Sequence, residues 1–283
     1  MPPAGRPLRL DDAAWIAPAA RAAISPLSES AFANLYLFRD VHRYRVVEGE
    51  LPHLLGSTYD GQEAALPLFD LDAAPVDQVK ALLGPSRQLY PVGEARAAAV
   101  ADRYEGGWSE ADSDYVYDAA RMRGLTGLKI RKAQADRFEA TATPRVQPIT
   151  GTADDRAALA VLDQWLADVA KPWAATDYAA CREAIEKREA LGLFGLLVFA
   201  GREPGGFVLA SEVAPDMAAI HFAKGLRSLD GVFPYMFRRF AQDHSQYAWV
   251  NFEQDLGHPG FRQAKRSYRP ARMQRKFRLR LRA

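Results

Sequence analysis

An uninterrupted apolar run from Leu193 to Ala200 constrains the fold more than any other feature of this sequence. Its length fits a strand that is buried on both faces. Two further strand-like segments follow, Phe207 to Val213 after Gly205-Gly206, and Ala218 to Ala223. Successive strands of this kind predict a sheet in the second half of the chain.

Helix signals lie on both sides of these strands. Thr152 with Asp155 resembles a capping box before an apolar helical face, and a second helix is expected from about Asp177 to Ala190. Asp230 is placed to cap a third helix, after which Tyr247 to Phe252 is the next strand. The predicted fold class is therefore α/β, with mixed sheets of the α+β kind.

The first half alternates short helices and strands in a similar way. The expected helices are Ser28 to Arg39, Val76 to Leu83 and Ala95 to Tyr104, and the expected strands are Tyr44 to Val47, Leu54 to Tyr59, Ala64 to Phe69 and Arg87 to Val92. A domain boundary is expected at Thr141 to Thr150, where two prolines interrupt any helix. The predicted domains are residues 1–143 and 144–283.

Composition excludes several classes of protein. Hydrophobic residues make up 48% of the chain and charged residues 25%, as in an ordinary globular protein. No run approaches the roughly 18 apolar residues needed to span a bilayer, and the first residues lack a signal-peptide layout, so a cytoplasmic location is expected. The single cysteine, Cys181, excludes an intramolecular disulfide and a multi-cysteine metal site, and its spacing with Tyr178 and Ile185 indicates a buried structural thiol.

Charge is distributed unevenly along the chain. The net charge is only +2, yet the stretch from Phe261 to the end holds ten basic residues and no acidic one. This asymmetry suggests an anionic partner. Within it, apolar residues alternate with arginines at strand period, which predicts an ordered terminal strand with one basic face. The alternating residues are Phe277, Arg278, Leu279, Arg280, Leu281 and Arg282.

The segment from Trp249 to Pro270 gathers carboxylates, a tyrosine and several basic residues. Glu253 and Asp255 lie two residues apart at the carboxyl end of the expected strand, where α/β sheets commonly place ligand-binding groups. A helix is expected from Phe261 to its end at Pro270. One face would carry Phe261, Ala264 and Tyr268, and the adjoining basic face Arg262, Arg266 and Arg269, with Lys265 at its margin.

These residue types suit transfer of an acyl group to an amine or a hydroxyl. Asp255 or Glu253 can orient the ammonium of a donor or take the proton of an acceptor, and Tyr268 can donate a proton to the leaving oxygen. The basic residues that can hold the donor's phosphates are Arg262, Lys265 and Arg269. By base rate, surface ion pairs and packing are the more frequent roles of such residues.

Two further candidates lie on the preceding strands. His221 is a candidate general base beside the expected cleft, and a hydrogen-bonded structural histidine is an equally frequent role. Glu212 is a candidate to bind an ammonium, with a surface charge as the alternative.

The segment from Trp249 to Pro270 also resembles a family signature. It is similar to the C-terminal domain of bacterial phosphatidylglycerol lysyltransferases, whose pattern runs roughly Asn-Arg-Glu-x-Asp-Leu-Gly and then Gly-Leu-Arg-x-Ala-Lys-x-Ser-Tyr-x-Pro. The matching residues are Asn251, Glu253, Asp255, Leu256, Gly257, Gly260, Arg262, Ala264, Lys265, Ser267, Tyr268 and Pro270. The chain departs from the pattern at Phe252, where the family has arginine, and at Ala223, where it often has glutamate.

Other segments agree with the same family. Phe32 to Tyr36 resembles its amino-terminal Phe-x-Asn-Leu-Tyr, and Ile220-His221-Phe222 with Lys224 resembles its Ile-His-Phe-Glu-Lys. Tyr115 and Tyr117 match an aromatic pair of the family, with strand packing as the alternative role. The resemblance thus implies substrate-binding roles for Asn251, Lys224 and Tyr117.

The family implies two tandem GNAT-like acyltransferase domains, the first degenerate, that take an amino acid from charged tRNA and place it on a lipid headgroup or another small acceptor. The first hypothesis is therefore an aminoacyl-tRNA-dependent aminoacyltransferase, with charged tRNA as co-substrate and no other cofactor or metal. Because no spanning segment is expected, peripheral contact with a membrane stays open.

Two alternatives concern the donor and the catalytic role. An acyl-coenzyme A N-acyltransferase would cradle a pyrophosphate in the loop from Gly225 to Phe233, but Asp230 opposes anion binding there and the usual second glycine is missing. The basic carboxyl end offers phosphate contacts to tRNA and equally to anionic lipids. A non-catalytic module that binds anionic surfaces or RNA through this end is the third hypothesis.

Overall fold

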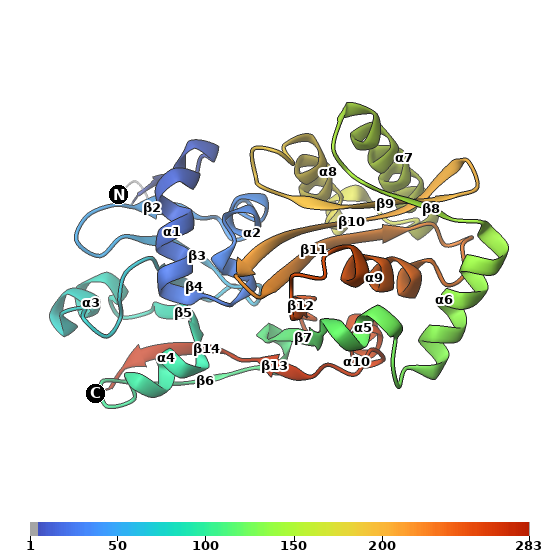
Figure 1. The fold of residues 1–283 in the computed structure, drawn as a ribbon. Helices are drawn as coiled ribbons and strands as arrows, with labels where there is room; N and C mark the ends of the chain where they lie inside the picture. Colours follow the sequence, from blue (N-terminus) through green and yellow to red (C-terminus); the bar gives the residue numbers. More distant parts are fainter. Residues whose placement is uncertain (1–4, 283) are drawn as a thin grey trace. The chain divides into compact units, whose positions relative to one another are not determined.

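The computed structural model describes residues 5–282, which form two compact units (Figure 1). The first unit contains the chain up to Tyr115, together with Glu253–Lys265 and the stretch from Arg272 on. The second contains Val116–Phe252 and Arg266–Ala271. This division differs from a single boundary between residues 143 and 144, because the chain enters the second unit already at Val116 and two C-terminal stretches return to the first unit.

A seven-stranded mixed sheet forms the first unit, in the order β1-β2-β3-β4-β5-β14-β6. Neighbouring strands are antiparallel except β4 and β5, which are parallel. The strands are β1 (Arg6–Pro7), β2 (Arg45–Val47), β3 (His53–Ser57), β4 (Glu63–Pro67), β5 (Gln88–Gly93), β6 (Tyr104–Trp108) and β14 (Lys276–Leu281). The helices are α1 (Ala13–Ile24), α2 (Phe32–Leu37), α3 (Val76–Leu83), α4 (Glu94–Ala99) and α10 (Pro259–Arg266), and short 3-10 turns cover Leu10–Asp12, Ser28–Ser30 and Glu110–Asp112.

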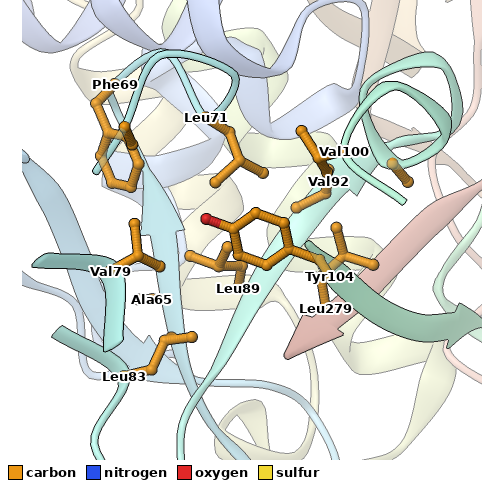
Figure 2. Close-up of a cluster of buried hydrophobic side chains, with 12 residues drawn as sticks. Ala65, Phe69, Leu71, Val79, Leu83, Leu89, Val92, Val100, Tyr104 and Leu279 are labelled. Atoms are coloured by element: carbon orange, nitrogen blue, oxygen red, sulfur yellow. The ribbon is translucent and has the colours of Figure 1, made fainter. Parts of the chain in front are cut away.

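One face of this sheet carries an apolar core. Figure 2 shows Tyr104 at the centre of the cluster, among Leu71, Leu89 and Leu279. The remaining members come from β4, β5, α3, α4 and the connecting loops: Ala65, Phe69, Ala74, Val79, Leu83, Val92, Ala97 and Val100. The apolar spacing of Val79 and Leu83 explains why Val76–Leu83 was predictable as a helix, and the structure confirms those bounds.

The terminal strand β14 was predicted correctly as a strand, but it belongs to a different sheet from the one expected. Alternation predicted a strand at the end of the second domain, but β14 lies between β5 and β6 of the first unit. Phe277 pairs with Val92 on one side and with Trp108 on the other. Strand period is a local property, whereas the partner of a strand is chosen by contacts that are remote in sequence.

The second unit is built around six strands in the order β7-β12-β11-β10-β9-β8. Neighbours are antiparallel except β11 and β12, which are parallel. The strands are β7 (Asp114–Asp118), β8 (Arg145–Pro148), β9 (Phe194–Ala200), β10 (Glu203–Ala214), β11 (Met217–Gly225) and β12 (Trp249–Asn251). The short strand β13 (Arg272–Gln274) begins the last stretch of the first unit. The helices are α5 (Ala119–Gly124), α6 (Lys129–Ala142), α7 (Thr152–Val169), α8 (Tyr178–Glu186) and α9 (Val232–Asp243), with a 3-10 turn at Trp173–Ala175.

Helices cover both faces of the central strands of the second unit. In Figure 1, α7 and α8 lie on one face of β9, β10 and β11, and α9 lies on the other. The apolar run beginning at Leu193 accordingly forms β9, and its centre, Leu196 to Val198, is buried as predicted. The expected linker is partly a strand, because β8 pairs with β9 through Gln147 and Leu197.

Helix starts are displaced from the predicted caps. Asp154, and not Asp155, closes the start of α7, where its Oδ2 accepts hydrogen bonds from the backbone nitrogens of Thr150 (3.0 Å) and Gly151 (3.3 Å). Gly151 is the capping position in place of Thr152. Similarly Gly231, with φ of +84°, precedes α9 in place of Asp230. The predicted helix to Tyr104 is also too long, because α4 ends at Ala99 and Tyr104 begins β6.

Candidate functional site

The chain after β12 makes a tight loop, Glu253 to Gly257, within the first unit. Glu253, Leu256 and Gly257 have left-handed backbone conformations, with φ of 59°, 55° and 73°. Such angles are unfavourable for glutamate and leucine, so the loop depends on contacts that hold it.

Asp255 supplies most of those contacts and is fully buried. Its Oδ2 accepts hydrogen bonds from the Tyr115 hydroxyl and from Arg262 Nε, both at 2.7 Å. Its Oδ1 accepts from Gly257 N at 2.8 Å and from an Arg262 Nη2 at 3.1 Å. Burial raises the pKa of this carboxyl, but these hydrogen bonds outweigh that effect and keep its pKa below the ordinary value. Asp255 is therefore an ionised anchor of the loop.

Glu253 is the more exposed carboxylate of the predicted pair. Its Oε1 accepts a hydrogen bond of 2.8 Å from Asn34 Nδ2. Asn34 belongs to the Phe32–Tyr36 segment that resembles the family. Two segments that are far apart in sequence and were singled out separately thus meet at this side chain.

Lys265 lies beneath the same loop. Its Nζ donates hydrogen bonds to the backbone carbonyl oxygens of Glu253 (3.1 Å) and Gln254, and lies 5.8 Å from the centroid of the Tyr115 ring. Burial lowers the pKa of Lys265 to about 8, although Glu253 and other nearby carboxylates oppose the shift. Lys265 thus makes its hydrogen bonds to the loop backbone.

A second group of buried charges lies in the first unit, around Lys276. Its Nζ is 2.6 Å from Asp114 Oδ1 and donates to Glu29 Oε1 (2.7 Å) and Gln254 Oε1 (2.8 Å). Burial lowers the pKa of Lys276, but the two carboxylates outweigh burial and raise it above its ordinary value. Sequence reasoning missed this group. The available signal was the position of Lys276 at the start of an alternating strand.

The basic C-terminal stretch does not present all its charges to a partner. At least five of its ten basic side chains lie within 4.0 Å of a carboxylate of the first unit. These pairs are Arg262–Asp255, Arg275–Glu94, Lys276–Asp114, Arg278–Asp112 and Arg282–Glu105. About half of the basic stretch is therefore paired with carboxylates within the protein.

The helix over the motif is shorter in the structure than predicted, so it does not carry all the motif residues. α10 stops at Arg266, so Tyr268 and Arg269 lie beyond it and belong to the second unit. Arg269 has a left-handed backbone (φ 52°), and its carbonyl oxygen accepts a hydrogen bond from Arg121 Nη1 at 3.2 Å. The predicted arginine face on one helix is therefore wrong for Arg269, although its side chain is exposed.

Tyr268 is buried in an aromatic cluster of the second unit. Its ring centroid lies 5.4 Å from that of Phe237, 6.1 Å from Phe252 and 6.5 Å from Tyr117. The guanidinium of Arg131 lies 5.0 Å from the Tyr268 ring, and burial raises the pKa of the tyrosine. We call Tyr117, Phe237, Phe252, Tyr268 and Arg131 the aromatic cluster. Phe252, the departure from the family arginine, is thus a packing residue here.

His221 and Glu212 lie on the neighbouring strands of the second unit. Ser211 Oγ and His221 Nε2 are hydrogen-bonded at 2.7 Å, and both side chains are buried. Glu212 accepts a hydrogen bond of 3.2 Å from the Tyr247 hydroxyl. Both predicted residues therefore have polar partners within the protein.

Lys224 and Asn251 are also buried in the second unit. Lys224 Nζ donates to both carboxylate oxygens of Asp177, at 2.7 and 2.8 Å, and lies 3.8 Å from the centroid of the Trp165 ring. Asn251 is fully buried in β12, opposite Val116 and Ala219. Of the eleven predicted site residues, the first unit holds four (Glu253, Asp255, Arg262, Lys265) and the second holds Tyr117, Glu212, His221, Lys224, Asn251, Tyr268 and Arg269.

The turn that precedes α9 packs against α6. A Cβ built on Gly231 would lie 2.2 Å from the carbonyl oxygen of Gln134, so the backbone of α6 packs directly on this turn. Val232 N donates to Leu229 O (3.2 Å), and Pro234 has no amide hydrogen to offer. Val232 and Pro234, two of the first residues of α9, therefore offer no free backbone donor to a pyrophosphate.

Residues 5–282 contain no cluster of three or more histidine, cysteine, aspartate or glutamate side chains that could hold a metal ion. Within the same range, no helix is both long and apolar enough to cross a membrane.

Comparison with known proteins gives one family and several similar structures. The family described as "Phosphatidylglycerol lysyltransferase, C-terminal" matches residues 21–280. A search of curated proteins finds no match. A conserved protein of unknown function from Bacteroides thetaiotaomicron is similar over 98% of this chain and 99% of its own, with 22% identity and a TM-score of 0.81.

Two further structures come from lysylphosphatidylglycerol synthetases. The C-terminal domain of a putative synthetase from Agrobacterium fabrum has 14% identity and a TM-score of 0.63, over 95% of this chain and 91% of that one. L-PGS from Bacillus licheniformis has 13% identity and a TM-score of 0.57, over 91% of this chain and 92% of that one. At these identities the likeness concerns the fold. Together with the two mixed sheets and the two compact units, it confirms the predicted α/β class with mixed sheets.

Proposed function

Because the chain belongs to the family of phosphatidylglycerol lysyltransferase C-terminal domains, we propose that it is an aminoacyltransferase that uses charged tRNA as its donor. Family and fold together indicate an acyltransferase of the GNAT type. The match over residues 21–280 is the observation that carries the proposal, since it includes the whole motif from Asn251 to Pro270. The acceptor we propose is a lipid headgroup or a small molecule.

The turn before α9 favours charged tRNA over acyl-coenzyme A as the donor. An acyl-coenzyme A enzyme of this fold needs free backbone amides there, and α6 packs on Gly231 while Asp230 adds a negative charge. The aminoacyl end of a tRNA does not need a pyrophosphate cradle. Exposed arginines such as Arg266 and Arg269 can contact its phosphates.

The geometry of the first unit suggests how the motif residues divide their tasks. Asp255 is buried and saturated with hydrogen bonds, so we assign it to holding the loop and Arg262. Glu253 is partly exposed, and we propose that it binds the ammonium of the aminoacyl group or accepts the proton of the acceptor. Lys265, with a pKa of about 8, supports the same loop and can exchange a proton near neutral pH.

The second unit supplies the remaining proposed residues. Burial raises the pKa of Tyr268, so its hydroxyl stays protonated at neutral pH and can donate a hydrogen bond or a proton. His221, which is hydrogen-bonded to Ser211 Oγ, is the alternative base, and Asn251, Glu212, Lys224 and Tyr117 are the proposed substrate-binding residues of this unit. We place the reaction in the cytoplasm, with peripheral contact to a membrane where the acceptor is a lipid.

A single-turnover transfer assay tests the proposal. The full chain is mixed with tRNAs charged with labelled amino acids, and with phosphatidylglycerol vesicles or a soluble small-molecule extract as acceptor. We expect label on one acceptor class, and Glu253→Gln should lower the rate by about 100-fold, the usual contribution of a general base. Glu189→Gln, at a carboxylate with 80% exposure, is the matched control and should retain the wild-type rate.

Thermal stability in the presence of acetyl-coenzyme A tests the alternative donor. A ligand that binds only the folded protein raises its melting temperature. We expect no rise at millimolar acetyl-coenzyme A. A clear rise, with no label transferred from any charged tRNA, would replace the proposal with a coenzyme A-dependent reaction.

A further inference from the structure

A cavity of about 800 Å³ lies in the first unit, and Leu256 of the motif loop is one of the residues that line it. Its volume is within the range of small-molecule binding pockets. Gln88, Arg278 and Gly107 line it, and they come from the adjacent strands β5, β14 and β6. Their strand neighbours Leu89 and Leu279 belong to the apolar cluster of Figure 2. Because side chains alternate along a strand, the cavity lies on the opposite face of the sheet.

Gln88 is an unusual residue for the wall of a cavity. Its side chain is only 6% exposed, and its Nε2 has no hydrogen-bond partner within residues 5–282. A buried amide without a partner destabilises a folded protein, and such groups are rare in native structures. A bound ligand that accepts a hydrogen bond from this amide would supply the missing partner.

Gly107 gives a second, independent indication. Glycine weakens the interior of a strand, and it often marks a place where another backbone or a ligand approaches closely. The neighbouring Gly106 has a structural reason, because a Cβ there would lie 1.8 Å from the carbonyl oxygen of Arg278. A Cβ at Gly107 would meet nothing within 4 Å. The space above Gly107 is therefore open to a bound molecule.

The charges around the cavity compensate one another. Arg278 donates to Asp112 Oδ2 through Nε (3.1 Å) and Nη2 (2.8 Å), and to Asp60 Oδ2 through Nη1 (2.7 Å). Glu105 and Arg280, which also line the cavity, lie opposite each other in the register of β6 and β14. Three carboxylates face two guanidinium groups, so the lining has no excess positive charge for a phosphate. A neutral ligand fits this lining best.

Tyr59 lines the cavity and is 44% exposed. Trp108 also borders the cavity, but by strand alternation its ring lies with Tyr104 on the other face of the sheet, where the guanidinium of Arg275 is 4.5 Å from the ring centroid. The ring of Tyr59 offers a flat apolar surface, while the carboxylates, guanidinium groups and amide of the lining offer both acceptors and donors. Hydroxyl groups both donate and accept hydrogen bonds, so a hydroxylated ring can pair with the donors and with the acceptors of the wall.

We propose that this cavity binds a neutral polyhydroxylated ring, such as a sugar unit, which stacks on Tyr59 and hydrogen-bonds to Gln88 and to the charged side chains of the wall. The ring could belong to a free sugar, to a glycan or to the ribose of a nucleoside. The site does not depend on the proposed aminoacyl transfer, and the two proposals stand or fall separately.

Binding of defined probes to the full chain tests the proposal. The probes are the methyl glycosides of glucose, galactose, mannose and N-acetylglucosamine, with adenosine and adenosine 5′-monophosphate as the nucleoside arm. Saturation-transfer NMR and titration calorimetry detect binding. We expect at least one neutral probe to bind, and the added phosphate not to tighten binding. Binding of glycosides identifies a sugar or glycan site, and binding of adenosine alone identifies a nucleoside site.

Three variants locate the binding. Gly107→Val fills the open space without a strained backbone angle and should abolish binding while the protein stays folded. Tyr59→Ala should weaken binding by roughly tenfold, as expected for loss of a stacked ring. Trp173→Ala, at an aromatic residue of the second unit that is 59% exposed, is the control and should have no effect.

Gln88→Met separates a ligand role from a structural one. It should weaken binding and at the same time raise the melting temperature, because it removes the unpaired buried amide. A lower melting temperature would mean that the amide stabilises the fold and would remove Gln88 from the site. The whole proposal fails if no neutral probe binds, if binding survives in Gly107→Val, or if the phosphorylated probe binds much more tightly than adenosine.

Discussion

Lys276 Nζ lies 2.6 Å from Asp114 Oδ1, and both side chains have 0% exposure. Glu29 shares the same ammonium at 2.7 Å. A lysine from the basic end of the chain thus neutralises two buried carboxylates of the first unit. This is the opposite of what a solvated basic tail would do.

Replacing Lys276 by methionine should therefore be strongly destabilising. The change leaves Asp114 and Glu29 buried without their cation, and loss of one partner of a buried ion pair costs about 3–5 kcal/mol. Urea unfolding measures the change in the free energy of unfolding. Arg280→Met, on the same strand but at an exposed position, is the control and should change it by less than about 0.5 kcal/mol. Equal effects of the two variants would contradict the assignment.

Removal of the C-terminal stretch should unfold the first unit. Deleting Arg272–Ala283 removes β14 from between β5 and β6, together with Lys276 and Leu279. Circular dichroism and amide NMR would show the loss. The deletion therefore cannot test whether this end binds an anionic partner. A variant with Arg272, Arg280 and Arg282 changed to glutamine tests that instead, since it should stay folded and lose salt-dependent RNA or lipid binding if the third hypothesis holds.

The elements of the fold were largely predictable because their signals are local. α3, β9, β10 and β11 follow from apolar period and from turn residues such as Gly205-Gly206. The position of β14 was not predictable, because its neighbours β5 and β6 lie more than a hundred residues earlier. The cap of α7 was misplaced by one residue because Thr152 and Asp155 have the same spacing as Gly151 and Asp154.

The candidate site was predictable in its residue types and much less in their environments. The motif predicted that Asp255 and Glu253 belong together, but only the contacts with Tyr115 and Asn34 reveal which carboxylate is buried. Tyr268 was placed on a helix because its spacing from Ala264 fits one, yet the chain leaves the helix at Arg266. No local feature of the sequence indicated the cavity at Gly107, apart from Gly106 and Gly107 within one strand.

Phe252 should be important for the stability of the second unit. Its ring lies 4.4 Å from Tyr117 and 4.5 Å from Phe237, measured between centroids. Phe252→Ala should cost about 3–5 kcal/mol, as is usual when a buried aromatic side chain is removed. Phe261→Ala is the matched control, because Phe261 is 54% exposed, and it should cost less than about 1 kcal/mol. Chemical denaturation compares the two, and a small effect at Phe252 would mean that the aromatic cluster is loosely packed.

Cys181 offers a probe of opening of the second unit. The thiol is fully buried on α8, and burial raises its pKa, so little thiolate is present and no reagent can reach it. A disulfide reagent should label the native protein at least about 1,000-fold more slowly than the unfolded chain, which corresponds to an opening free energy of about 4 kcal/mol. The chain has one cysteine, so the rate reports this position alone. Rapid labelling of the native protein would contradict the burial.

Lys265 should make stability increase with pH between about pH 8 and the ordinary lysine value of 10.5. Burial lowers its pKa to about 8 in the folded protein, so within this window the unfolded chain binds more protons than the folded one. Linkage then requires the free energy of unfolding to rise with pH, by up to about 3 kcal/mol over the whole window. Below pH 8 the lysine is protonated in both states, and the cost of burying its charge is present in full.

Lys265→Met removes this contribution. Urea unfolding at pH 7.5, 8.5 and 9.5 should show a rise in stability for the wild type relative to Lys265→Met, and measurements stop there because tyrosines begin to ionise in the unfolded chain near pH 10. Tyr115, whose pKa is raised first by burial and then by its hydrogen bond to Asp255, would oppose the trend above that pH. Lys80→Met, at an exposed lysine of α3, is the control and should follow the wild type. If Lys265→Met follows the wild type as well, the ammonium of Lys265 is solvated, and its proposed role in holding the loop at Glu253 fails with it.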